Sequence, residues 1–228
     1  MDALHAVRLL QFGDSAFPVG SFSFSSGLES AVQEGVVADA ATLASFTRTS
    51  TRRAATSDGI ALLHAHRAVA DGFADRIVEI DRTVYARKLN EEVRTQSVRT
   101  GKKLAEVALN IAPSPLVKEW LRSINDGTAP GTFPIGLGVA FAELELPEEH
   151  AFAVHQYGVA MSILGAALRL MRIDHMATQT ILFEVSAEVE ADYVEIAAAA
   201  LSDMAAFAPV TDLLATAHVR SHVRMFMN

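Results

Sequence analysis

The stretch EEHAFAVHQYGVAMSILGAALRL, residues 148–170, is the most hydrophobic part of the chain and decides which fold the rest can form. No Asp, Glu, Lys or Arg occurs from His150 to Leu168, a run of about the length that crosses a membrane. The run contains two histidines and a glutamine, however, and it lies between Glu149 and Arg169. We therefore expect a buried helix in the core of a helical bundle, with no membrane association.

Apolar residues elsewhere recur every three or four positions, and the alternation typical of strands is almost absent. Asp39, Asn90 and Asp174 are placed to cap helices, and Ser57 and Asp58 are placed to open one. Ser25 or Ser26 could cap a further helix, with Glu29 three residues after Ser26 as a capping box. The expected helices cover about residues 4–12, 26–36, 39–55, 57–70, 73–89, 90–111, 114–124, 133–144 and 148–171, followed by one from Asp174 and one over 187–206.

These patterns predict an all-α fold, a single-domain bundle of about ten helices over residues 1–209. In the helix over 90–111 the predicted apolar face consists of Val93, Val98, Leu104, Val107 and Ile111. In the central helix the small residues Gly158, Ser162, Gly165 and Ala166 indicate close helix packing, in the core or at a homodimer seam.

Residues 210–228, VTDLLATAHVRSHVRMFMN, form a short amphipathic and basic C-terminal tail. Such a segment can order on a partner by laying its apolar side chains in a groove, so we expect it to bind one. Two histidines four residues apart, His218 and His222, share one helical face and are a weak metal-site candidate. The other tail residues expected at the partner interface are Leu213, Leu214, Val219, Arg220, Val223, Arg224 and Phe226.

Composition excludes several classes of function. The 228 residues carry a net charge of −8, which argues against nucleic-acid binding. The chain contains no cysteine, so it has neither disulfides nor thiolate metal sites. Its N-terminus, MDALHAVRLLQF, does not resemble a signal peptide, and we expect a cytoplasmic protein.

No sequence motif predicts catalysis or a bound cofactor. The Gly-Lys pair in GKKL, residues 101–104, lacks the glycine that a phosphate-binding loop needs five residues earlier. The serine-rich segment GSFSFSSG, residues 20–27, does not match a nucleophile elbow and is best explained as a structured loop. Two alternatives remain open: an enzyme that uses Asp14, Ser23 and Glu29, and a stand-alone helical scaffold or regulator.

One segment carries a family resemblance. LLQFGDSAFPVGSFSFSSGLESAVQEGVV, residues 9–37, resembles the N-terminal signature of UreF, a family of urease accessory proteins. Further similarity lies in ARKLNEEVRTQSVRTGKKL, in FPIGLGVAF, in SILGAALRLMRIDHMATQTIL and in the C-terminal tail, so the resemblance covers nearly the whole chain.

The resemblance implies a non-enzymatic, all-α maturation factor without a cofactor of its own. Proteins of this family form homodimers and bind UreD (also called UreH). That complex recruits the GTPase UreG and docks on apo-urease (UreABC), to which the assembly delivers nickel. For a contact that regulates UreG, the candidates are Glu29 and the residues near the end of the central helix, Arg169, Arg172 and Asp174.

Overall fold

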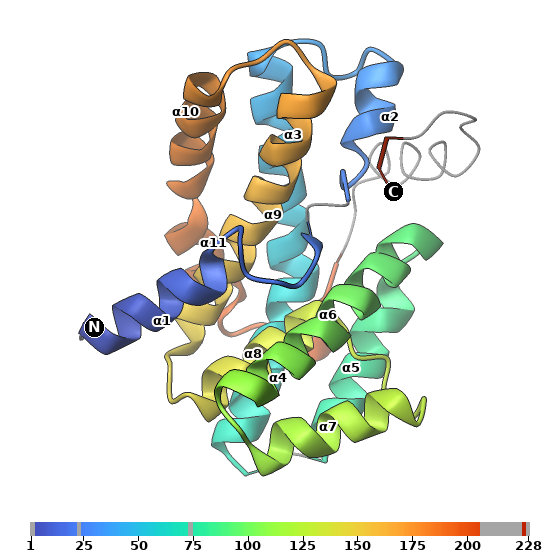
Figure 1. Ribbon diagram of the computed structural model, residues 1–228, viewed down its shortest axis with the longest axis vertical. Helices are drawn as coiled ribbons and strands as arrows, with labels where there is room; N and C mark the ends of the chain where they lie inside the picture. The colour runs from blue at the N-terminus through green and yellow to red at the C-terminus, as the bar shows by residue number, and fades with distance from the viewer. Residues whose placement is uncertain (1–2, 22–23, 73–74, 206–224, 227–228) are drawn as a thin grey trace.

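The computed structural model describes residues 3–21, 24–72, 75–205 and 225–226, and every regular element within them is helical (Figure 1). The predicted all-α fold is therefore confirmed. The α-helices are α1 (Ala3–Gly13), α2 (Leu28–Gln33), α3 (Ala40–Ala54), α4 (Ile60–Ala70), α5 (Arg76–Arg87), α6 (Glu91–Ile111), α7 (Pro115–Asn125), α8 (Phe133–Glu143), α9 (Glu148–Leu170), α10 (His175–Ser186) and α11 (Val189–Ile196).

Helix α9 is the central element and contributes to two hydrophobic clusters (Figure 1). Its first half places Ala151 and Phe152 in a cluster with α4, α6 and α8. Its second half places Ile163 and Leu164 in a cluster with α2, α3 and α10. Among the described residues α9 has the length and apolarity of a membrane span, yet 56% of its most apolar window is buried inside the molecule. It is a core helix, as the sequence predicts.

Three of the predicted helix caps are confirmed. The Asp39 side chain accepts a hydrogen bond from the Thr42 amide, Asn90 caps α6, and Asp174 caps α10. The capping box at Ser26 is wrong. Helix α2 begins instead after Gly27, which adopts φ 83°, and the Glu29 side chain is used elsewhere.

The predicted helix start at residue 57 is also wrong. Helix α3 continues through a π-helical turn, Ala55–Gly59, directly into α4. Asp58 does not cap a helix, because its carboxylate faces the core and accepts hydrogen bonds from Lys88 Nζ at 2.6 and 2.7 Å. The buried Gln156 supports this irregular turn with its side-chain amide. The amide nitrogen donates to the Thr51 carbonyl at 2.9 Å, and the amide oxygen accepts from the Ala55 main-chain amide at 3.3 Å.

The helix predicted over 187–206 is shorter than expected. Helix α11 ends at Ile196, and a 3₁₀ turn, Leu201–Asp203, follows it. Because the helix ends early, Leu201 and Met204 can pack against the hydrophobic cluster formed with α4, α6 and α8. This burial outweighs the helix propensity of the four alanines at 197–200.

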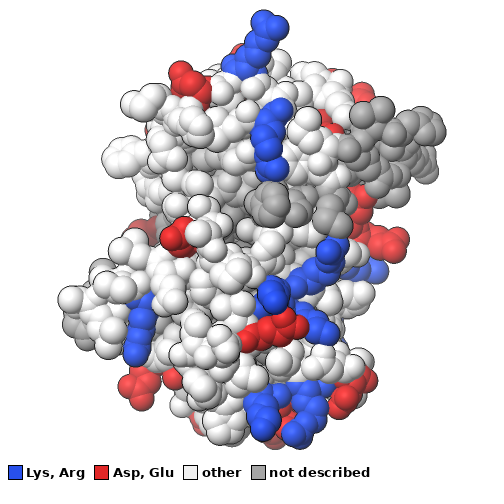
Figure 2. All heavy atoms as spheres, in the orientation of Figure 1, with Lys and Arg blue, Asp and Glu red and all other residues white. Residues whose placement is uncertain are grey.

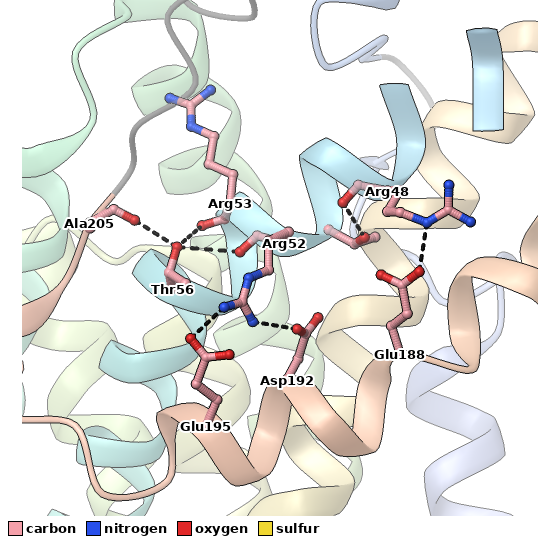
Figure 3. Close-up of polar contacts among 9 residues, drawn as sticks. Arg48, Arg52, Arg53, Thr56, Glu188, Asp192, Glu195 and Ala205 are labelled. Atoms are coloured by element: carbon pink, nitrogen blue, oxygen red, sulfur yellow. Dashed lines mark hydrogen bonds and ion pairs between the residues drawn. The ribbon is translucent and has the colours of Figure 1, made fainter. Parts of the chain in front are cut away.

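Helix α11 and the chain after it are attached to α3 and the π-helical turn by polar contacts (Figure 3). The Thr56 hydroxyl donates a hydrogen bond to the Ala205 carbonyl at 2.7 Å, and the Ala205 amide donates one to the Thr56 carbonyl at 2.9 Å. The ion pairs are partly exposed, so each is expected to contribute at most about 1 kcal/mol. They join Arg48 to Glu188 and Arg52 to both Asp192 and Glu195.

The predicted apolar face of α6 is largely wrong. Apart from Leu104, the side chains that it buries are small or polar, and Ile111 is exposed. Helix α6 approaches the segment before α8 so closely that a Cβ on Gly101 would lie 2.1 Å from the Gly131 carbonyl oxygen. Bulky valines cannot occupy such a contact. The buried residues of α6 are Ser97, Thr100, Gly101, Leu104, Ala105 and Ala108.

Candidate partner-binding surface

The short helix α2 holds the end of the chain through Glu29. This side chain is 3% exposed, and its carboxylate accepts hydrogen bonds from the main-chain amides of Met225 at 2.8 Å and Phe226 at 3.1 Å. Hydrogen bonds to an ionised carboxylate are about twice as strong as neutral ones, so Glu29 is an anchor for residues 225–226.

Arg169 completes this anchor from the other side. The Phe226 ring is 5% exposed and belongs to the second hydrophobic cluster, and the Arg169 guanidinium carbon lies 4.1 Å from the ring centroid. A guanidinium at this distance makes a favourable cation–π contact. The structure therefore brings together three of the predicted partner-binding residues, Glu29, Arg169 and Phe226, and we call them the C-terminal anchor.

Replacing Glu29 with alanine is expected to release residues 225–226 without unfolding the helical body, since α2 keeps its apolar contacts. Loss of a buried acceptor leaves two main-chain donors unpaired, at a cost of about 1–3 kcal/mol for the docked state. Hydrogen exchange of the Met225 and Phe226 amides should accelerate accordingly. Glu34→Ala, an exposed change at the end of α2, is the matched control, and equal protection in both variants would contradict the contact.

The remaining candidates of the regulatory surface have different positions. Arg172 is exposed just beyond the end of α9, where it is accessible to another protein. Asp174 accepts a hydrogen bond from the Ala177 amide at 2.8 Å, so its role as the N-cap of α10 accounts for this residue. The candidate tail residues other than Phe226 lie outside the described part of the chain, and their role stays a prediction: Leu213, Leu214, His218, Val219, Arg220, His222, Val223 and Arg224.

The described residues contain no group of three or more His, Asp or Glu side chains arranged to hold a metal ion. His64 Nε2 lies 3.0 Å from the Ala199 carbonyl, and His66 Nε2 lies 2.8 Å from that of Leu146. These histidines tie α4 to separate segments of the fold.

The enzyme alternative loses its proposed grouping. Asp14 lines a cavity beside α9, whereas the Glu29 carboxylate is committed to the C-terminal anchor and does not line that cavity. Ser23 lies outside the described residues. Asp14 also accepts a hydrogen bond from the Ala16 amide at 2.8 Å, as expected of an aspartate that shapes a turn.

A buried polar cluster formed by Asp58, Lys88 and His155 was not predicted from the sequence. The Lys88 side chain is 8% exposed and that of Asp58 20%, and His155 Nε2 lies 4.0 Å from Asp58 Oδ2. Burial by itself raises the pKa of Asp58, but the nearby positive charges, led by Lys88, outweigh burial and hold that pKa below its usual range. Burial lowers the pKa of His155 to about 4, so its imidazole is neutral at pH 7.

This cluster predicts a loss of stability in mild acid. In the unfolded chain the pKa of His155 returns to about 6.5, so between pH 6.5 and 4 the unfolded state binds more protons than the folded state. Stability should therefore fall as the pH decreases through this window, with a slope approaching about 1.4 kcal/mol per pH unit from this residue. Urea denaturation at several pH values measures the slope. His155→Gln should reduce it, and an unchanged slope would contradict the assignment.

The chain is similar in sequence to proteins of one known family. The model of the UreF family matches residues 37–186, which exclude both the N-terminal segment 9–36 and the tail. The chain is 54% identical to urease accessory protein UreF 2 of Brucella canis over 222 residues, covering 97% of this chain and 91% of that protein. It is 45% identical to urease accessory protein UreF of Yersinia pseudotuberculosis over 230 residues, covering 100% of both chains.

Proposed function

This chain belongs to the UreF family of urease accessory proteins, and from that membership we propose that it takes part in urease maturation as a non-catalytic binding protein. In this proposal it binds UreD/UreH in the cytoplasm, recruits the GTPase UreG, and helps to deliver nickel to apo-urease. The observation that carries the proposal is the similarity over nearly the full length to proteins named for this role.

The C-terminal anchor supports a partner site at the end of α9. Glu29 and Arg169 hold Phe226 in place, and the exposed Arg172 lies three residues from Arg169 along the chain. Residues 210–228 would then meet UreD/UreH next to a fixed point on the helical body. Arg172 is in this proposal the residue that contacts UreG, because its side chain is accessible.

Homodimerisation is part of the same proposal. Large apolar side chains are exposed on α1 and α10, with Leu10 68%, Met176 76% and Phe183 83% exposed. Exposed apolar groups of this size favour a protein interface. Of the small residues expected at a seam on α9, Ala166 is fully buried in the core, whereas Gly158 is exposed.

Co-expression with UreD/UreH and UreG tests the proposal. Purification through a tag on this chain should recover UreD/UreH, and UreG only when UreD/UreH is present. Deletion of residues 210–228 should abolish recovery of both, while Glu34→Ala, the control outside the C-terminal anchor, should not change it. Normal recovery of UreD/UreH by the truncated chain would refute the role of the tail, and failure of the intact chain to recover it would refute the proposed complex.

A separate assay tests regulation. Arg172→Ala should leave UreD/UreH binding intact and change the rate of GTP hydrolysis by UreG in the assembled complex. Unchanged hydrolysis in that variant would mean that this chain acts as a physical bridge only.

A further inference from the structure

A cavity of about 460 Å³ lies between α9, α6, α8 and the loop that follows α1. This volume falls in the range of small-molecule sites, about 300–1,000 Å³. Its lining is mainly apolar and includes Phe17, Leu104, Phe133 and Leu137. One face of α9 from Val154 to Arg169 borders it, about 22 Å at 1.5 Å per residue, so the cavity is elongated.

Two glycines in the middle of α9 keep this space open. Gly158 and Gly165 line the cavity, and a Cβ built on either would have no heavy atom of the described residues within 4 Å. Elsewhere in the fold, at Gly101 and Gly138, a Cβ would meet backbone oxygens at 2.1 and 2.6 Å, so close packing explains those glycines. Glycine weakens a helix interior, and packing against the described residues does not explain its presence at 158 and 165.

The buried polar cluster forms one end of the cavity. Asp58, Lys88 and His155 all line it, and Asp58 reaches it from the π-helical turn. His155 is 3% exposed, and its Nδ1 has no hydrogen-bond partner in the described part of the chain. Buried ion pairs are a poor source of stability, and π-helical turns occur frequently at functional sites. An unpartnered buried imidazole beside such a pair indicates a site built for a ligand.

The charges around the cavity select the kind of ligand. Four cationic side chains line it against two carboxylates, and Lys88 already neutralises that of Asp58. Arg87 donates to the main-chain carbonyls of Met204 and Ser202, contacts that leave its positive charge in place. The cations are Arg53, Arg87, Lys88 and Arg169, and the second carboxylate is that of Asp14.

We propose that this cavity binds an elongated organic anion, a carboxylate on an aliphatic chain. The carboxylate lies at the end formed by Lys88 and Arg53, and the chain extends along α9 past Gly158 and Gly165 over the apolar lining. The polar end of the cavity carries none of the partner contacts proposed above, whereas the far end shares Arg169 with the C-terminal anchor.

Calorimetric titration with dodecanoate, below its micelle concentration, tests the proposal on the full chain. Dodecanoate should bind with a stoichiometry of one per chain, and dodecyltrimethylammonium, which has the same chain and the opposite charge, at least tenfold more weakly. Gly165→Leu places a leucine side chain in the path of the aliphatic chain and should weaken dodecanoate binding at least tenfold. Gln179→Leu adds the same side chain on the exposed face of α10 and should not change the affinity.

A second pair of variants tests the head-group end. Arg53→Gln should weaken dodecanoate binding several-fold, whereas Arg48→Gln, on the same helix and paired with Glu188 away from the cavity, should not. Circular dichroism establishes that each variant is folded. Equal affinity for the two detergents, or unchanged dodecanoate binding by folded Gly165→Leu, would overturn the proposal, as would binding of many molecules per chain.

Discussion

Replacing Lys88 with methionine is expected to destabilise the protein by about 3 kcal/mol or more, because the substitution leaves the Asp58 carboxylate without its cation in a largely buried position. The ammonium donates to both carboxylate oxygens, at 2.6 and 2.7 Å. Methionine keeps most of the side-chain volume, so the loss reports on charge and not on packing. Urea denaturation at pH 7 gives the free energy of unfolding.

The control for this prediction is Lys103→Met, which removes an exposed lysine paired with Glu106 and should change the stability by less than about 1 kcal/mol. The double variant Asp58→Asn, Lys88→Met should recover much of the loss, since neither charge is then buried alone. Equal effects of Lys88→Met and Lys103→Met would show that Asp58 is adequately solvated without its partner.

Two glycine-to-alanine substitutions in helix interiors should have opposite effects. Gly101→Ala is expected to destabilise by about 3 kcal/mol, because the new Cβ would lie 2.1 Å from the Gly131 carbonyl oxygen and backbone atoms must move. Gly165→Ala is expected to stabilise by about 0.5–1 kcal/mol, since it meets no described atom within 4 Å and alanine favours the helix.

Thermal and urea denaturation of both variants measure the difference. Each variant is the control for the other, because the chemical change is identical and both sites lie in long helices. Destabilisation of the same size at both positions would mean that helix propensity and close approach are not the deciding factors, and that the α6 contact with the segment before α8 is looser than described.

Local signals predicted the architecture well. Caps at Asp39, Asn90 and Asp174 were correct because each depends only on a side chain and the amides two or three residues later. The prediction of a buried central helix was correct because residues 150–168 carry no charged side chain on any face, whereas a surface helix has a charged or polar face. Such features depend only on residues that are close together in the sequence, so they can be predicted from the sequence alone.

Errors arose where a distant segment determines the local structure. The sequence predicts a helix start at Ser57 and Asp58, yet the Asp58 carboxylate accepts a hydrogen bond from Lys88, thirty residues away. Val98 and Ile111 on α6 resemble a buried stripe, yet the closeness of the chain before α8 selects the face that carries Gly101. Neither partner can be identified from the helix pattern itself.

In the C-terminal anchor, too, the individual residues could be predicted from the sequence, but their contacts with one another could not. The sequence singled out Glu29, Arg169 and Phe226 individually, but as residues that contact other proteins. Their contact with one another is a tertiary arrangement that joins α2, α9 and the chain end. No spacing along the chain indicates it, because the Phe226 amide and the Glu29 carboxylate are 197 positions apart.

Activation of apo-urease is the decisive test of a role of this chain in urease maturation. Urease subunits, UreD/UreH, UreG and nickel are combined with or without this chain, and ammonia release from urea is measured. We expect substantial activity only when the chain is present, with no activity from the chain alone and a loss of activation on deletion of residues 210–228. Full activation in its absence, under conditions where UreD/UreH and UreG are folded, would contradict a role in urease maturation.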